Sequence, residues 1–130
     1  MVDDEPDIRD TMSRGLEAEG FLVETSGDPE EALASFKPGV YDLAILDIRM
    51  PKMNGFQLFR EIRKIDPAVR VCFITAFEVY YDEFKKVFPK INVSCFVSKP
   101  VSIKKLAEII REELARPELA LGEPVPPERQ

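Results

Sequence analysis

The chain has 130 residues, enough for one domain with a buried core, and its 45% apolar and 32% charged residues are ordinary for a globular protein. A formal net charge of -6 argues against direct nucleic-acid binding by this chain, because phosphate backbones are met by clustered Lys and Arg. Histidine is absent, which excludes histidine triads, imidazole metal ligands and a phosphohistidine within the chain.

In chain order, helical patterns alternate with short apolar runs. The helical patterns lie at residues 6–20, 28–37, 56–65 and 102–114, with Pro6, Asp28-Pro29 and Ser102 as start signals. The apolar runs lie at residues 21–23, 43–46, 69–74 and, more weakly, 95–97. Short apolar runs without clean alternation are typical of strands covered on both faces. The pattern predicts an α/β fold with a mostly parallel sheet.

Two stretches fit this pattern poorly. Residues 76–93 have no clear period, although a short helix could end at Pro89. From Pro117 onward the helical period is lost and prolines accumulate. We therefore expect residues 117–130 to form a flexible tail or the start of an interdomain linker.

Chemically useful side chains follow the ends of the predicted strands. They are Asp3, Asp4, Asp47, Thr75 and Lys99. Because the carboxyl ends of parallel strands meet at one edge of a sheet, we expect these groups to lie together. Three adjacent carboxylates repel one another unless a cation intervenes, and Mg²⁺ (or Mn²⁺) prefers such oxygen ligands. A carboxylate in this setting can accept a phosphoryl group, although each residue alone could equally be a cap or a surface charge.

Several stretches resemble the receiver domain of two-component response regulators. Residues 2–6 resemble its opening acidic pair, and residues 46–55 resemble its phosphoacceptor loop. Thr75-Ala76 resembles its switch hydroxyl, and Lys99-Pro100 resembles its lysine and the proline that follows. The resemblance extends over residues 1–116, which we expect to form one receiver domain.

The resemblance implies a flavodoxin-like α/β fold, with five parallel strands in the order 2-1-3-4-5 and helices on both faces. Asp47 would accept phosphate from a histidine kinase or a phosphotransfer protein. The metal, Mg²⁺ or Mn²⁺, would be held by Asp3, Asp4, Asp47 and the backbone carbonyl of Arg49. The phosphorylated domain would then switch a face that binds a partner.

The resemblance also implies roles near the third and fourth predicted runs. Thr75 and Lys99 would hold the phosphoryl oxygens, and Phe96 would be an aromatic switch residue. The Lys99-Pro100 peptide bond would be cis, which is common only before proline.

The chain departs from the family at its start, where only Met1-Val2 precede the acidic pair. Receivers usually carry four or five apolar residues there, so we expect a truncated first strand. In the implied order this strand is central, and its neighbours would lack hydrogen-bond partners. Either the start is merely a boundary of the given sequence, or the missing pairing comes from elsewhere. We expect a truly truncated chain to self-associate, as a homodimer or a strand-exchanged oligomer.

Two further positions bear on the lifetime of an aspartyl phosphate. Arg49 and Phe77 each lie two residues after a key site residue, where a long cation and a large ring could shield the phosphoryl group from water. The alternative is that both are solvent-facing loop residues. An aromatic cluster that also includes Tyr80, Tyr81 and Phe84 could bind partners or belong to the core.

The best interpretation is a phosphorylation switch that assists its own phosphorylation and dephosphorylation and is not a metabolic enzyme. One alternative is a degenerate receiver that binds or dimerises independently of phosphate. Another is an aspartyl-phosphate phosphatase, which is disfavoured because Arg49 occupies a position where such enzymes need an acid.

Two observations bear on the cellular compartment. No run approaches the ~20 apolar residues of a membrane span, and no signal peptide opens the chain, so we expect a cytoplasmic protein away from the membrane. Cys72 and Cys95 both lie in apolar runs, far apart in the sequence and without metal-ligand spacing. We expect both to be buried small hydrophobic residues and not a disulfide.

Overall fold

The computed structural model describes residues 1–75 and 95–116. The helices are α1 (Pro6–Ala18), α2 (Pro29–Ser35), α3 (Gly55–Ile65) and α5 (Ile103–Leu114), and the strands are β1 (Leu43–Asp47), β2 (Arg70–Thr75) and β3 (Phe96–Ser98). The predictions for Phe77, for the aromatic cluster around it and for the 117–130 tail lie outside the described residues. None of the described helices combines the length and apolar character that crossing a bilayer requires.

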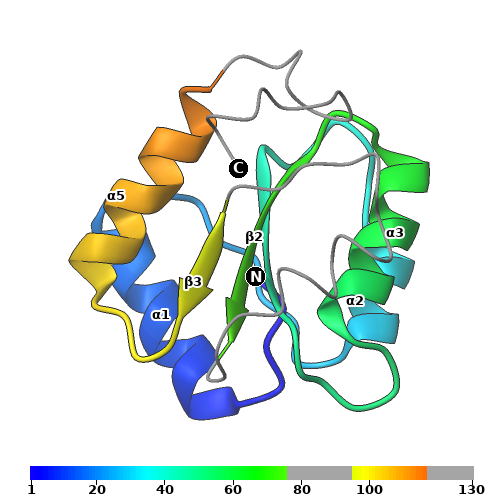
Figure 1. Ribbon diagram of the computed structural model, residues 1–130, viewed down its shortest axis with the longest axis horizontal. Helices are drawn as coiled ribbons and strands as arrows, with labels where there is room; N and C mark the ends of the chain where they lie inside the picture. Colours follow the sequence, from blue (N-terminus) through cyan, green and yellow to red (C-terminus); the bar gives the residue numbers. More distant parts are fainter. Residues whose placement is uncertain (76–94, 117–130) are drawn as a thin grey trace.

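The three strands form a parallel sheet in the order β1-β2-β3, with Leu43 opposite Arg70 and Phe73 opposite Phe96. Helices α1 and α5 lie on one side of the sheet, and α2 and α3 lie on the other (Figure 1). Each face of the sheet has its own apolar cluster, because successive side chains of a strand point to opposite faces. The predicted α/β class, with parallel strands between helices, is confirmed.

The helix starts follow the signals in the sequence. Asp28 accepts hydrogen bonds from the N–H groups of Glu30 and Glu31, and Ser102 accepts one from Lys105. Asn54 and Gln57 form a reciprocal capping box at the start of α3. These caps fix where each helix leaves the carboxyl edge of the sheet, and so they position the loops of the site.

The start of the chain lies between β1 and the segment around Ser26. Val2 forms parallel bridges with both Ser26 and Leu46. The Val2 N–H donates to the Ile45 carbonyl at 2.8 Å, and the Val2 carbonyl accepts from the Asp47 N–H at 2.9 Å. This arrangement follows the expected 2-1-3 order locally, but the regular sheet of the described residues has three strands, and a five-stranded order is not established.

The predicted strand at residues 21–23 is wrong. No regular strand occurs there, and Leu22 is fully exposed. A strand needs a neighbour to receive its hydrogen bonds. Among the described residues that neighbour is Met1–Asp3, which bonds to the segment only at Glu24 and Ser26.

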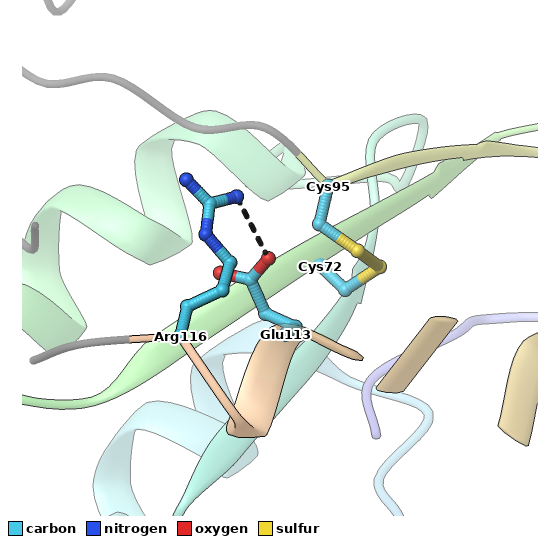
Figure 2. The surroundings of a disulfide bond; sticks show 4 residues. All are labelled: Cys72, Cys95, Glu113 and Arg116. Atoms are coloured by element: carbon cyan, nitrogen blue, oxygen red, sulfur yellow. Dashed lines mark hydrogen bonds and ion pairs between the residues drawn. A yellow bond between two sulfur atoms is a disulfide. The ribbon is translucent and has the colours of Figure 1, made fainter. Parts of the chain in front are cut away.

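The cysteine prediction was correct for burial and wrong for pairing. Cys72 of β2 and Cys95, just before β3, are both buried and form a disulfide with a Cα–Cα distance of 4.7 Å (Figure 2). Their 23-residue separation hides the pairing in the sequence, whereas the register Phe73 opposite Phe96 brings 72 and 95 side by side. Near the bond, Arg116 pairs with Glu113 at the end of α5 (Figure 2).

Candidate functional site

The carboxyl edge of the sheet gathers the predicted groups. Asp47 is the last residue of β1 and is 3% exposed, and Thr75 is the last residue of β2 and is also buried. Lys99 directly follows β3, and Asp3 and Asp4 directly follow Val2. The parallel sheet therefore brings together residues that span almost the whole described chain.

Four carboxylates converge at this edge. Each of Asp3, Asp4, Glu5 and Asp47 has an oxygen atom within 4.8 Å of the others. Asp3 and Asp47 are buried, whereas Asp4 and Glu5 are more open to solvent. One side of the cluster is therefore closed by the protein and the other can admit a small ligand.

The Lys99 ammonium lies among these acids, with its side chain 7% exposed. Its Nζ is 2.9 Å from Asp3 Oδ2, 3.2 Å from Glu5 Oε1 and 3.5 Å from Asp47 Oδ2. Although burial acts to lower it, contacts with Asp3 and Asp47 raise the pKa of Lys99 above its ordinary value. Lys99 therefore stays a cation and neutralises part of the carboxylate charge.

The protein surroundings disfavour the charged form of Asp47. Burial, with the nearby Asp3 charge, raises the pKa of Asp47 from 3.8 to about 7, and Lys99 opposes this shift only in part. The Arg49 N–H lies 3.4 Å from Asp47 Oδ1, and the Arg49 side chain is exposed. The backbone after β1 thus turns around the Asp47 carboxylate.

These residues fit a hard divalent cation. Asp3 Oδ2 is completely enclosed and accepts no hydrogen bond among the described residues, with Lys99 as its ion-pair partner. An enclosed oxygen of this kind, in a cluster of mutually repelling carboxylates, is suited to coordinate Mg²⁺ or Mn²⁺. Asp3, Asp4 and Asp47 supply the type of ligand expected from the sequence.

Thr75 ends β2, and Lys99 directly follows the adjacent strand β3. The Lys99 N–H donates to the Thr75 carbonyl at 2.7 Å, and Thr75 is opposite Ser98 in the β2–β3 register. The Lys99-Pro100 bond is cis, as the resemblance implied. Phe96 is partly buried with its ring 5.5 Å from that of Phe73.

Sequence reasoning missed two residues beside the acids. Glu5 is an ion-pair partner of Lys99, and its place in the same acidic run as Asp3 was an available signal. Arg9 donates from Nη1 to the Asp3 carbonyl at 2.7 Å, one turn into α1. A Cβ on Gly27 would lie 2.4 Å from that Nη1, so Gly27 leaves room for the guanidinium. No local pattern pointed to Arg9.

The loop after Asp47 is held by two further residues. A Cβ on Gly55 would lie 2.5 Å from the Asp47 carbonyl oxygen, so only glycine lets α3 begin this close to β1. Lys52, in a left-handed conformation, forms ion pairs with Asp28 at 2.8 Å and Glu30 at 3.5 Å. The loop is thereby tied both to the strand end and to the start of α2.

Comparison with known proteins identifies the class. Residues 1–111 match the response regulator receiver domain family, and the chain belongs to this family. A CheY-like receiver domain protein from Methanospirillum hungatei JF-1 has a similar structure, with a TM-score of 0.76 and 30% identity over 87% of this chain and 89% of that one. The response regulator TrrA from Thermotoga maritima, solved in complex with Mg²⁺-BeF, has a TM-score of 0.71 and 33% identity over 85% of this chain and 93% of that one.

Curated relatives are longer proteins. A probable transcriptional regulator, ycf27, from Guillardia theta is 38% identical over 89% of this chain and 44% of its own length. The transcriptional regulatory protein CreB from Escherichia coli is 33% identical over 89% of this chain and 50% of its own length. The chain therefore spans half or less of the length of these relatives.

Proposed function

We propose that this receiver domain is a magnesium-dependent switch that is phosphorylated on Asp47. The observation that carries the proposal is the buried Asp47 carboxylate, which ends β1 next to three other acids and 3.5 Å from the Lys99 ammonium. A buried acid with a strongly raised pKa, in contact with a specific cation, is characteristic of reactive sites. Membership of the receiver family agrees with this role.

In this proposal Asp47 attacks the phosphorus of a phosphohistidine on a histidine kinase or phosphotransfer protein. A bond forms between an Asp47 carboxylate oxygen and phosphorus, and the bond between phosphorus and the donor imidazole breaks. Asp3, Asp4, Asp47 and the Arg49 carbonyl would hold Mg²⁺ or Mn²⁺, which neutralises phosphoryl charge when bound.

Lys99 and Thr75 would bind the transferred group. The Lys99 ammonium is already held beside Asp47, and a small movement away from Asp3 would direct it to a phosphoryl oxygen. The Thr75 hydroxyl belongs to the neighbouring strand end and would meet a second oxygen. Phe96, partly buried next to the β2 core, would change its packing with Thr75 and alter a partner-binding face.

We further propose that the domain works in the cytoplasm as a switch that promotes its own phosphorylation and dephosphorylation. Arg49 and Phe77 would slow loss of the phosphoryl group by covering it. The exposed Arg49 side chain provides no carboxylate for proton transfer, which speaks against a phosphatase. The cluster of four acids, with the Lys99 ammonium held between them, disfavours a module that works independently of phosphate.

Acetyl phosphate with Mg²⁺, followed by intact mass measurement, tests the proposal. We expect one added phosphoryl group in the wild type and none in Asp47→Asn or in the presence of EDTA. Asp42→Asn is a matched control, because this exposed acid lies at the opposite end of β1. A phosphoryl group that still appears on Asp47→Asn would contradict the assignment of Asp47 as the acceptor. Steady hydrolysis of a phosphomonoester by the wild type would favour the phosphatase.

A further inference from the structure

The Cys72–Cys95 disulfide joins the two strands that lead to Thr75 and Lys99. Cys72 lies inside β2, three residues before Thr75. Cys95 directly precedes Phe96, the first residue of β3. Because β3 has only 3 residues, few hydrogen bonds hold it against β2. The covalent bond therefore contributes much of what fixes β3 and the residues that it carries.

The sheet accommodates these two cysteines with or without the bond. Their Cα atoms are 4.7 Å apart, close to the spacing of about 4.8 Å between neighbouring strands of any sheet. Both side chains belong to the apolar cluster on the α1 and α5 side, where a reduced thiol packs as a small hydrophobic group. Breaking the bond therefore removes the covalent link and leaves the pairing of β2 with β3 possible, as a reversible site requires.

The bond lies beside the last turn of α5, at the amino end of β3 and away from the acid cluster. Both cysteines are buried, and the ion pair between Glu113 and Arg116 lies next to them (Figure 2). The end of a helix opens more readily than the strands of a core. A reductant can therefore reach the disulfide through local opening of the end of α5, without unfolding of the sheet.

We propose that Cys72 and Cys95 form a reversible redox site, whose disulfide locks β3 to β2 and restrains the functional site until a dithiol reduces it. A thiolate of the dithiol attacks one cysteine sulfur, so that the Cys72–Cys95 bond breaks and a mixed disulfide forms. The second thiol of the reductant then displaces the remaining cysteine sulfur. The protein thereby gains two electrons and two protons, and the dithiol becomes a disulfide.

The lock opposes the movements that phosphorylation of Asp47 requires. Lys99 has to leave Asp3 for a phosphoryl oxygen, and Phe96 has to change its packing against Phe73. Both residues move with β3, so the oxidised protein accepts phosphate more slowly than the reduced one. This regulation rests on the proposed function, and it suits a cytoplasmic protein because disulfides there are usually transient.

Hydrogen exchange of the whole chain tests the lock without phosphate. Dithiothreitol should give the folded protein two alkylatable thiols, and oxidised glutathione should restore the bond. On reduction, exchange at the Phe73 amide, which donates to the Cys95 carbonyl at 2.9 Å, should accelerate at least ten-fold more than at the Ile48 amide. Ile48 is the matched control, because its amide donates to the Ile74 carbonyl on the other side of β2. Equal acceleration at the two amides, or reduction only in the unfolded protein, would show a purely structural cross-link and overturn the proposal.

Acetyl phosphate with Mg²⁺, after removal of the reductant, gives the functional readout by intact mass. We expect the reduced protein to gain its phosphoryl group at least three-fold faster than the oxidised protein. Cys95→Ala, with Cys72→Ala as a second variant, should react at the reduced rate in both redox buffers. Equal rates in the two states of the wild type would overturn this regulation and leave the proposed function intact. Absence of phosphorylation in both states would refute the proposed function, while the exchange comparison would still decide whether the bond locks β3.

Discussion

Replacing Asp47 with Asn should stabilise the metal-free protein, and more strongly at pH 8 than at pH 5. Asp47 is buried beside Asp3, which raises its pKa from 3.8 to about 7. Between these two pH values the folded protein holds a proton that the unfolded chain releases. The free energy of unfolding therefore falls as pH rises through this window and levels off above the folded-state pKa.

The expected magnitude follows from the width of that window. One pH unit in which the folded and unfolded states differ by one proton corresponds to about 1.4 kcal/mol. Between pH 5 and pH 8 the difference persists for about two units, so the wild type should lose about 3 kcal/mol relative to Asp47→Asn. Lys99 retains its ion pairs with Asp3 and Glu5 in the variant, so no unpaired ammonium offsets the gain.

The measurement is urea denaturation of both proteins in EDTA at pH 5, 6, 7 and 8. The gap in the free energy of unfolding between Asp47→Asn and the wild type should widen with pH. Asp42→Asn, the same substitution at the exposed end of β1, should leave the wild-type pH dependence in place. A gap that is the same at pH 5 and pH 8 would refute the attribution of the pKa shift to burial beside Asp3.

Three other substitutions probe the supports of the site. Lys99→Met removes the cation between Asp3 and Asp47, so the free energy of unfolding in EDTA should fall by about 3 kcal/mol. Added Mg²⁺ should then stabilise the variant more than it stabilises the wild type, and equal stabilisation of the two proteins would contradict this. Gly55→Ala drives a Cβ to within 2.5 Å of the Asp47 carbonyl and should cost about 1–3 kcal/mol by thermal unfolding, so an unchanged melting temperature would be inconsistent with the close approach. Cys95→Ala removes a cross-link that spans 23 residues and should lower the free energy of unfolding by about 3 kcal/mol in denaturant titrations, as should reduction of the wild type. Two alkylatable thiols in the unreduced, unfolded wild type would disprove the disulfide.

Local signals were sufficient for the helices and for most of the sheet. Asp28-Pro29 and Ser102 mark the starts of α2 and α5 because their side chains satisfy amides that the helix leaves open. The runs at 43–46 and 69–74 became β1 and β2 because both faces of these strands are covered. In these elements the local sequence pattern favours the same helix or strand that packing in the folded domain requires.

The pairing of strands and of cysteines could not be predicted from these local sequence patterns. The 21–23 run has the composition of a strand, but strand formation depends on a neighbour that extends alongside it, and Met1–Asp3 reaches only Glu24 and Ser26. The Cys72–Cys95 bond depends on the register between β2 and β3, which no property of either run encodes alone.

The site was predictable where a residue ends a strand or directly follows it. Asp47, Thr75 and Lys99 meet because parallel strands end at a common edge. Arg9 lies inside α1 and acts through the backbone carbonyl of Asp3, so its role depends on how α1 is tilted against the acidic turn. A contact between a long side chain and a carbonyl six residues earlier has no sequence period and appears only in the folded structure.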